Sequence, residues 1–227
     1  SVSGTTAINT AAITTVAGQT YSGPVTLGAD TTLSGVGISL GGTLKSDGTS
    51  RSLTINDSGT TTLSGAVGGA GAAGDKLSSL STDAAGSTAI LGGSISTTGS
   101  QTFNDAVTLG ADATLAASDT GAAITLVSAV NSASSATPRA LTINVGGSGG
   151  AVVLGSPVGA TAPLRSLTVT ASDIAVNAGV VTSSAGQTYS GPVTLGADTT
   201  LTTTDSAVLF SSTVNSTGGS LADLRPS

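Results

Sequence analysis

The chain contains no Cys, His, Met or Trp, so several kinds of chemistry are excluded at the outset. Without Cys it can form neither a disulfide nor a thiolate metal site. Without His or Cys the usual nucleophile–base triads cannot be assembled. Glu is also absent, and charged residues make up only 8% of the chain, against roughly a quarter in an average protein. Catalysis would therefore have to rely on Asp, Lys, Arg and hydroxyl groups.

The sparse charges also limit the partners of the chain. The net charge is -6, and the basic residues are too scattered to follow a phosphate backbone, so we expect no nucleic-acid binding. No apolar run approaches the roughly 18 residues that span a bilayer, so we expect no membrane insertion. The opening letters, SVSGTTAINT, do not read as a signal peptide, and we expect a mature piece or an internal segment. The basic residues are Lys45, Arg51, Lys76, Arg139, Arg165 and Arg225.

Aromatic residues are nearly absent as well, at 2% of the chain, which excludes a globular core filled by large rings. Apolar residues still reach 38%, mostly Val, Leu, Ile and Ala, and the mean hydropathy is +0.36. Such a composition is too apolar for a disordered chain. Small aliphatic and β-branched side chains instead suit narrow cores built from stacked strands.

One sequence motif occurs three times in the chain. QTYSGPVTLGADTTL runs over Gln19–Leu33 and again over Gln187–Leu201, and a close relative, QTFNDAVTLGADATL, runs over Gln101–Leu115. The copies begin 82 and 86 residues apart. We therefore interpret residues 1–227 as one continuous domain. Its sequence units are the tail of a preceding unit (1–18), two full units (19–100 and 101–186) and a partial unit (187–227).

The repeat has the pattern of short strands. In PVTLGADTTL the apolar residues Val25, Leu27 and Leu33 alternate with Thr, and Gly, Asn, Asp or Ser interrupt the runs every few residues. Short strands, frequent turns and a long period predict an all-β fold, a parallel β-helix or β-solenoid with roughly 20 residues per coil. Each unit would then hold about four coils, with the copies stacking like residue on like residue. The alternative is a string of tandem β-sandwich repeats, which the lack of bulky core residues disfavours.

The repeated string resembles a known family. Together with PLRSLTV at Pro163–Val169, the three copies of the motif are similar to repeats of large filamentous haemagglutinin-like bacterial exoproteins, also described as β-strand repeat proteins. The resemblance implies a right-handed parallel β-helix and secretion to the cell surface. It also implies a role as a stalk, an adhesin or a matrix fibre.

Three carboxylates share one place in the repeat and are the candidate metal ligands. Asp30, Asp112 and Asp198 each end the letters GAD, and a repeated low-affinity calcium site is one interpretation. The other is an Asx turn that caps a corner of the coil. We favour the turn, because the nonapeptide calcium signature is missing and the three Asp lie several coils apart.

Three aromatic residues also share one place. Tyr21, Phe103 and Tyr189 could form a platform for sugars, or each ring could cover a corner of its coil, which we favour. Thr-rich stretches such as GTTTL at Gly59–Leu63 raise the idea of a flat Thr array that binds ice. Such an array needs a T-x-T ladder in every coil, and because the Thr positions drift along the sequence, we expect none.

A single group of charges resembles a catalytic constellation. Asp47 and Asp57 flank Lys45 and Arg51, and some β-helix enzymes that act on polysaccharides use clustered Asp, Arg and Lys. A solvated, turn-rich loop explains the same residues and is the interpretation that we favour.

The function predicted from these patterns is structural. We expect a non-enzymatic segment of a bacterial cell-surface or extracellular fibrous protein, which gives a stiff rod for adhesion, matrix or filament formation. No catalytic residue and no cofactor is predicted. The expected partners are the continuing chain or a second copy stacked end to end, with host or matrix glycans as further partners. The alternative is a carbohydrate-binding or carbohydrate-active β-helix.

Overall fold

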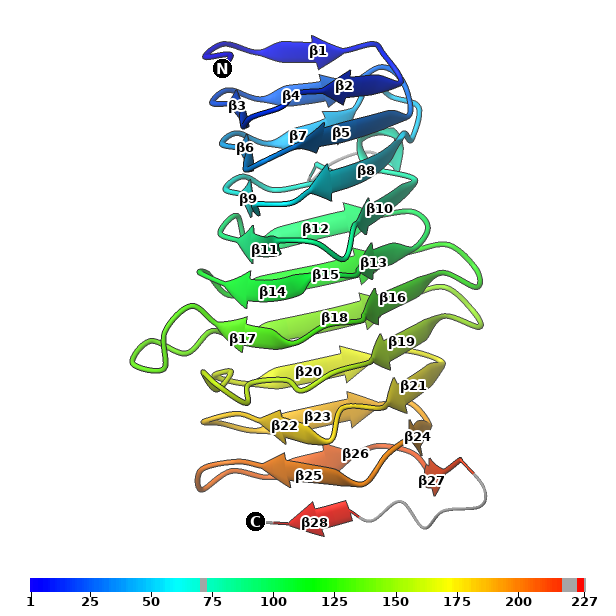
Figure 1. The fold of residues 1–227 in the computed structure, drawn as a ribbon. Helices are drawn as coiled ribbons and strands as arrows, with labels where there is room; N and C mark the ends of the chain where they lie inside the picture. Colours follow the sequence, from blue (N-terminus) through cyan, green and yellow to red (C-terminus); the bar gives the residue numbers. More distant parts are fainter. Residues whose placement is uncertain (70–72, 218–223, 227) are drawn as a thin grey trace.

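The computed structural model describes residues 1–69, 73–217 and 224–226 and shows a parallel β-helix (Figure 1). All pairings between the described strands are parallel, and residues stacked in successive turns are 19 to 28 residues apart, about 22 on average. These findings confirm the all-β solenoid and its coil of roughly 20 residues. They exclude tandem β-sandwiches, whose strands pair antiparallel. The one helical element described is a single 3-10 turn, η1 (Ala73–Asp75), and no helix there has the length and hydropathy to cross a membrane.

The chain visits three faces in a fixed order. Face 1 begins with β1, face 2 with β2 and face 3 with β3, and the order then repeats down the axis. Face 2 is a single ten-stranded sheet, whereas faces 1 and 3 each combine a three-stranded and a six-stranded sheet. An isolated bridge links the two parts, at Val67 on face 1 and at Val158 on face 3.

The strands are short on every face. Face 1 holds β1 (Thr6–Ile8), β4 (Val25–Leu27), β7 (Leu44–Ser46), β12 (Ser94–Thr97), β15 (Ala113–Ala117), β18 (Leu141–Val145), β20 (Leu167–Thr170), β23 (Gln187–Ser190) and β26 (Val208–Phe210). Face 2 holds β2 (Ala12–Thr14), β5 (Thr31–Gly35), β8 (Ser52–Asp57), β10 (Ser79–Thr82), β13 (Gln101–Phe103), β16 (Ala123–Leu126), β19 (Ala151–Leu154), β21 (Asp173–Val176), β24 (Val193–Leu195) and β27 (Val214–Ser216). Face 3 holds β3 (Gln19–Tyr21), β6 (Ile38–Leu40), β9 (Thr60–Leu63), β11 (Ser87–Ile90), β14 (Ala106–Leu109), β17 (Val130–Ser132), β22 (Val180–Thr182), β25 (Thr199–Thr202) and β28 (Leu224–Pro226).

Along most strands, alternate side chains point into one continuous apolar core. Within it, stacked positions repeat residue types of similar size, as where Leu53 lies on Leu80. Burying one Leu or Val contributes about 1.5–3 kcal/mol, so the narrow core gains its stability from many small contributions. The inward positions predicted from the repeat are at most 6% exposed, which confirms the prediction. They are Val25, Leu27, Leu33, Val107, Leu109, Leu115, Val193, Leu195 and Leu201.

The sequence repeat and the turn of the solenoid have different lengths. Gln19 begins β3 on face 3, Gln101 begins β13 on face 2, and Gln187 begins β23 on face 1. Each full unit comprises ten strands and one further strand position, which is marked by the isolated bridges of Val67 in the first unit and of Val158 in the second. Eleven strand positions on three faces make three and two-thirds turns. Each unit thus holds close to the predicted four coils, but the copies begin on different faces, so the prediction that they stack like on like is wrong.

Because of this mismatch, equivalent corners occur on different faces. Ser46 ends β7 on face 1, where its hydroxyl accepts the backbone N–H of Arg51 at 2.9 Å and donates to a carbonyl of the next turn at 2.9 Å. Ser132 ends β17 on face 3 and makes the same two bonds, at 2.9 Å from the N–H of Arg139 and at 2.8 Å to the next turn. Faces 1 and 3 thus accept the same local structure.

The Gly of the repeated VTLG lies close to a side chain of the preceding turn. A Cβ atom added to Gly28 would overlap the Oδ1 atom of Asn9 in the preceding turn, and one added to Gly196 would overlap the Oδ1 atom of Asn177. Real Cβ atoms do not approach other atoms so closely. Gly at these two corners therefore leaves room for an Asn side chain of the preceding turn, which would have to move if a larger residue replaced the Gly.

Replacing Leu109 by Asp should unfold the chain around β14, because an unpaired charge in the core costs several kcal/mol. Thr108→Asp is the matched control, since Thr108 belongs to the same strand but is partly exposed. Thermal unfolding followed by far-ultraviolet circular dichroism should show a large drop in Tm for Leu109→Asp alone. Equal melting of the two variants would show that the inward face is misassigned.

Candidate functional site

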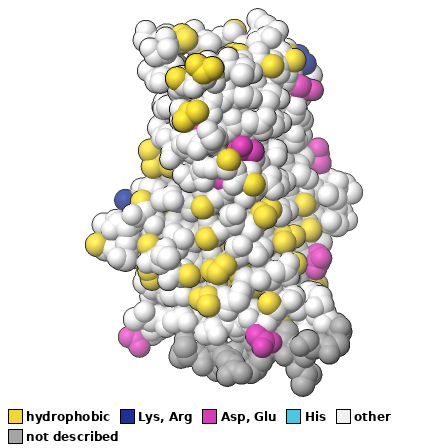
Figure 2. Space-filling view, viewed as in Figure 1, with side chains coloured by type: hydrophobic (Ala, Val, Ile, Leu, Met, Phe, Trp, Pro, Cys, Tyr) yellow, Lys and Arg dark blue, Asp and Glu magenta, His cyan; other side chains and the backbone are white. Residues whose placement is uncertain are grey.

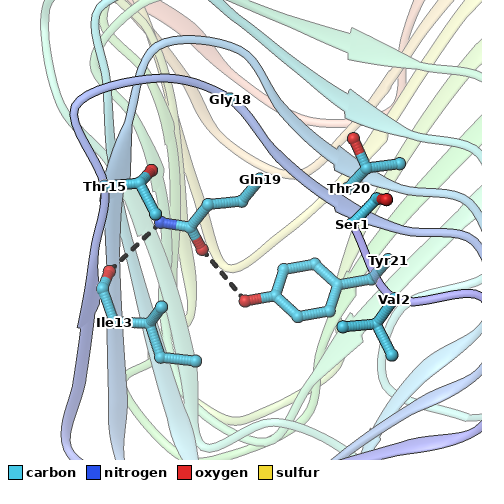
Figure 3. Close-up of a pocket in the computed structure, with 8 residues that line it drawn as sticks. All are labelled: Ser1, Val2, Ile13, Thr15, Gly18, Gln19, Thr20 and Tyr21. Carbon is cyan, nitrogen blue, oxygen red and sulfur yellow. Dashed lines mark hydrogen bonds between the residues drawn. The ribbon is translucent and has the colours of Figure 1, made fainter.

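A pocket of about 140 Å³ opens beside the first turn, and Gln19 and Tyr21 contribute its main polar side chains (Figure 3). The Tyr21 hydroxyl donates to Gln19 Oε1 at 3.0 Å. The Gln19 side-chain amide donates to the carbonyl oxygens of Ile13 at 3.2 Å and Ser34 at 2.8 Å. These bonds already use the donors of Gln19 and Tyr21, so the hydroxyls of Ser1, Thr15 and Thr20 are the other polar side-chain groups that line the pocket.

The same Gln–Tyr pair recurs deep in the core. Gln187 and Tyr189 are 0% exposed, and the Tyr189 hydroxyl donates to Gln187 Oε1 at 3.0 Å. The Gln187 amide donates to the carbonyl oxygens of Val181 at 3.1 Å and Thr202 at 2.9 Å. Burial raises the pKa of Tyr189, so its hydroxyl stays protonated and donates. A network that is identical inside the core and beside the pocket serves to join strands and turns.

The middle copy breaks this network. The Gln101 amide keeps its donor bonds to the carbonyl oxygens of Ile95 at 3.2 Å and Ala116 at 2.8 Å, but residue 103 is Phe instead of Tyr. As a result, Gln101 Oε1 is buried without a hydrogen-bond partner. A buried acceptor without a partner costs about 1–3 kcal/mol.

The three aromatic residues do not form a sugar platform. Tyr21 is 6% exposed, while Phe103 and Tyr189 are 0% exposed. Tyr189 stacks instead on Phe210 of the next turn, with ring centroids 5.1 Å apart and planes at 14°. Rings that fill the core cannot stack on a glycan, so the interpretation as a glycan contact is wrong for these residues. The rings lie inside the coil.

The Asp residues of GAD lie at three different corners. Asp30 lies between faces 1 and 2, Asp112 between faces 3 and 1, and Asp198 between faces 2 and 3. Asp30 Oδ1 accepts the backbone N–H of Ser52 at 2.8 Å, and Asp112 Oδ1 accepts that of Ala140 at 2.9 Å. These two carboxylates therefore hold the backbone of the next turn, whereas an Asx turn would hold their own. Among the described residues, no three His, Cys, Asp or Glu lie close enough to hold a metal ion.

The charged constellation predicted around residue 50 is divided in the structure. Arg51 pairs with Asp47 at 3.1 Å, and its hydrogen bond lowers the pKa of Asp47. Lys45 pairs with Asp75 of the next turn at 3.1 Å. Asp57 is 2% exposed and points inward, away from the exposed pairs. The four residues thus share no common site.

Asp57 is a buried anchor for the backbone. Its Oδ1 accepts the N–H of Gly37 at 2.6 Å and of Gly59 at 2.9 Å, and its Oδ2 accepts the N–H of Ile38 at 2.7 Å and the hydroxyl of Thr61 at 2.9 Å. Burial by itself raises the pKa of Asp57, but these donors outweigh it and the net pKa is lowered. The charged form is therefore the native one.

Asp105 is a second buried carboxylate, and sequence analysis missed it. It is 3% exposed and accepts the hydroxyls of Thr82 at 2.6 Å and Thr88 at 2.7 Å. Burial raises its pKa, and the nearby charge of Asp83 adds to the rise, while the two hydroxyls only partly oppose it. The available signal was the departure of the middle copy, which has Asn-Asp where the other copies have Ser-Gly.

Comparison with known proteins identifies no relative of this chain. No protein-family model, no curated protein and no solved structure matches this chain. The likeness to haemagglutinin-like repeats therefore depends on the repeated motif alone. The candidate residues found in the structure act on packing and on the backbone of neighbouring turns.

Phe103→Tyr should stabilise the chain by about 1 kcal/mol, because the new hydroxyl would reach Gln101 Oε1 as Tyr189 reaches Gln187. Tyr189→Phe should destabilise it by about 1–3 kcal/mol, since it leaves a buried acceptor without a partner. Tyr21→Phe is the control beside the pocket, where water can replace the lost donor, and its loss should be smaller. Urea unfolding measures all three. A less stable Phe103→Tyr variant would show that the core has no room for the hydroxyl.

The two buried carboxylates should respond to pH with opposite signs. Because the pKa of Asp57 is lowered on folding, its charge stabilises the fold above the unfolded pKa of about 3.8, and this stability is lost as pH falls through the folded pKa. The pKa of Asp105 is raised, so its charge costs stability at neutral pH, and the cost disappears as pH falls toward 3.8.

Asp57→Asn should therefore lower the free energy of unfolding at pH 7, with a loss that shrinks in acid. Asp105→Asn should leave that energy unchanged or raise it at pH 7, with any gain vanishing in acid. Chemical unfolding from pH 3 to pH 8 measures both, and each variant is the control for the other. Parallel pH profiles for the two variants would contradict the assignment.

Proposed function

We propose that this chain is a non-enzymatic, rod-forming segment of a bacterial cell-surface or extracellular fibrous protein. The observation that carries the proposal is the continuous core, which runs from Ile8 in the first turn to Leu201 near the last without interruption. A rod held by backbone bonds between all its turns resists bending and gives length and contact area. Such a rod serves adhesion, matrix or filament formation.

The use of the reactive side chains supports the non-enzymatic part of the proposal. Asp57 and Asp105, the buried carboxylates, are tied to backbone N–H groups or Thr hydroxyls, and the Gln–Tyr pairs are bonded to each other. Lys45 and Arg51 are held in exposed ion pairs. No cofactor is proposed. The carbohydrate-active alternative lacks the aromatic surface on which a sugar would stack, since the three repeated rings are buried.

The proposed partners are inferred from the strand edges of the terminal turns. Exposed apolar side chains occur in the terminal turns, at Val2, Val16, Leu209 and Val214, and also in inner turns, at Val36, Leu91 and Val127, so the proposal depends on the strand edges and not on these side chains. Open strand edges pair readily with further strands. We therefore propose that further turns of a longer chain, or a second copy stacked end to end, cover these edges. The absence of Cys and the likeness to haemagglutinin-like repeats support an extracellular location.

Inserting extra copies of residues 101–186 between residues 186 and 187 tests the rod. Each unit should add three and two-thirds turns, about 18 Å at the usual strand spacing, without changing the cross-section. Small-angle scattering of variants with one, two and three added units should show linear growth of the maximum dimension. A cross-section that grows with the added units would contradict the proposal.

A polysaccharide panel tests the enzymatic alternative. The chain should release no sugar from any substrate, and Asp47→Asn should behave as the parent chain does. Turnover that Asp47→Asn or Asp57→Asn abolishes would replace the structural proposal by an enzymatic one.

A further inference from the structure

The strand register brings hydroxyl groups into line on face 2. Five outward residues of successive turns lie directly opposite one another in β5, β8, β10, β13 and β16. We call this column the first hydroxyl ladder. It consists of Thr32, Thr54, Ser81, Thr102 and Thr125.

A second hydroxyl ladder lies on face 1. Its members are Ser94, Thr114, Thr142, Thr168 and Thr188 in β12, β15, β18, β20 and β23, again directly opposite one another. Its four Thr residues are one sequence unit later than the first four members of the first ladder. Each column holds one hydroxyl residue per turn and covers only part of its face, since Ala12, Val153 and Ala175 occupy the same column of face 2, so no T-x-T array runs through every coil. Because the loops between strands differ in length, the sequence alone does not reveal which Thr residues lie opposite each other in successive turns.

Both ladders lie on the surface, carry no charge and make few side-chain hydrogen bonds. Their residues are partly or fully exposed, and the only side-chain hydrogen bond described for them is a 3.5 Å bond from Ser81 to the carbonyl of Thr82. The strands that carry them contain a single charged residue, Asp57, which is buried. Ion pairs such as Arg165–Asp112 lie at the corners, and charged side chains are few and isolated in the view of Figure 2. A flat neutral face repels no other copy of itself.

We propose that the two hydroxyl ladders are lateral contact surfaces for a second copy of this chain, an inference that depends on the rod-forming function proposed above. Two parallel solenoids share the same axial spacing of about 4.8 Å, so the rungs of one rod fit between the rungs of another over several turns. Facing sheets pack about 10 Å apart, with interdigitated side chains. Thr suits such a contact because its methyl group packs and its hydroxyl donates and accepts.

The size of one contact makes it weak alone. Five turns give a length of about 24 Å, and three to five residues of strand give a width of about 10–17 Å. One ladder thus offers about 240–400 Å² per partner, less than the roughly 800 Å² of a standard stable interface. Many ladders in series along a long rod would bind together with far higher avidity.

The faces on which the two ladders lie determine whether the rods assemble into a closed pair or into a bundle. The first ladder is on face 2 and the second on face 1, because the repeat moves back by one face with each unit. One rod therefore meets different neighbours at different heights. The expected assembly is a bundle or network of rods, and not a closed pair.

Engineered cysteines test the contact cleanly, since the chain has none. The single variants Thr142→Cys and Thr168→Cys each change one inner rung of the second ladder. Ala175→Cys is the matched control, because Ala175 points outward on face 2 below the first ladder and is also partly exposed. Under equal oxidation, the ladder variants should form intermolecular disulfides about tenfold faster than the control. Equal rates for the ladder variants and the control would overturn the proposal.

Lys variants identify the occupant and check folding. Thr142→Lys with Thr168→Lys should abolish the concentration-dependent rise in the scattering cross-section, whereas Val153→Lys with Ala175→Lys should not. Circular dichroism confirms that both variants remain folded. If the parent cross-section never rises, or if the ladder variant instead loses binding to an insoluble polysaccharide, the lateral proposal is wrong. Linear growth of the inserted-unit rods would remain intact in either case, so the two proposals fail separately.

Discussion

The hydrogen bonding of each turn to the turns above and below is the constraint on which the whole structure depends. Parallel strands stacked at about 4.8 Å must keep their register, because a slip by one residue would exchange the inner and outer side chains. The polar interior serves this register. Asp57, Gln19 and Gln187 donate or accept bonds that join segments distant in sequence, and each is at most 5% exposed.

A second consequence is that the three faces become interchangeable. The Gln–Tyr pair occurs on face 3 and on face 1, and the Ser corner occurs on face 1 and on face 3. Such exchange is possible because the core is narrow and filled by residues of similar size, so no face needs a special large side chain. A repeat of eleven strand positions can therefore wind around the axis without matching the turn, which spreads each surface feature around the rod.

The middle unit differs from its neighbours at two buried places. Phe103 leaves Gln101 Oε1 without a donor, and Asp105 introduces a carboxylate whose charge is opposed by burial. Both departures lie within a few residues of each other, in the strand and turn that join face 2 to face 3. They lower local stability inside an otherwise regular solenoid, since unpaired acceptors and buried charges are costly.

The sequence by itself determined the strand periodicity, the parallel solenoid and the inward residues such as Leu109, because alternation and turn residues are local signals. It could not show that Tyr189 is buried, that Asp30 holds the next turn, or that Thr114 and Thr142 stand in one column. Those facts depend on which residues lie opposite each other in successive turns. Loops of unequal length between the strands set that register, and only the tertiary structure decides it.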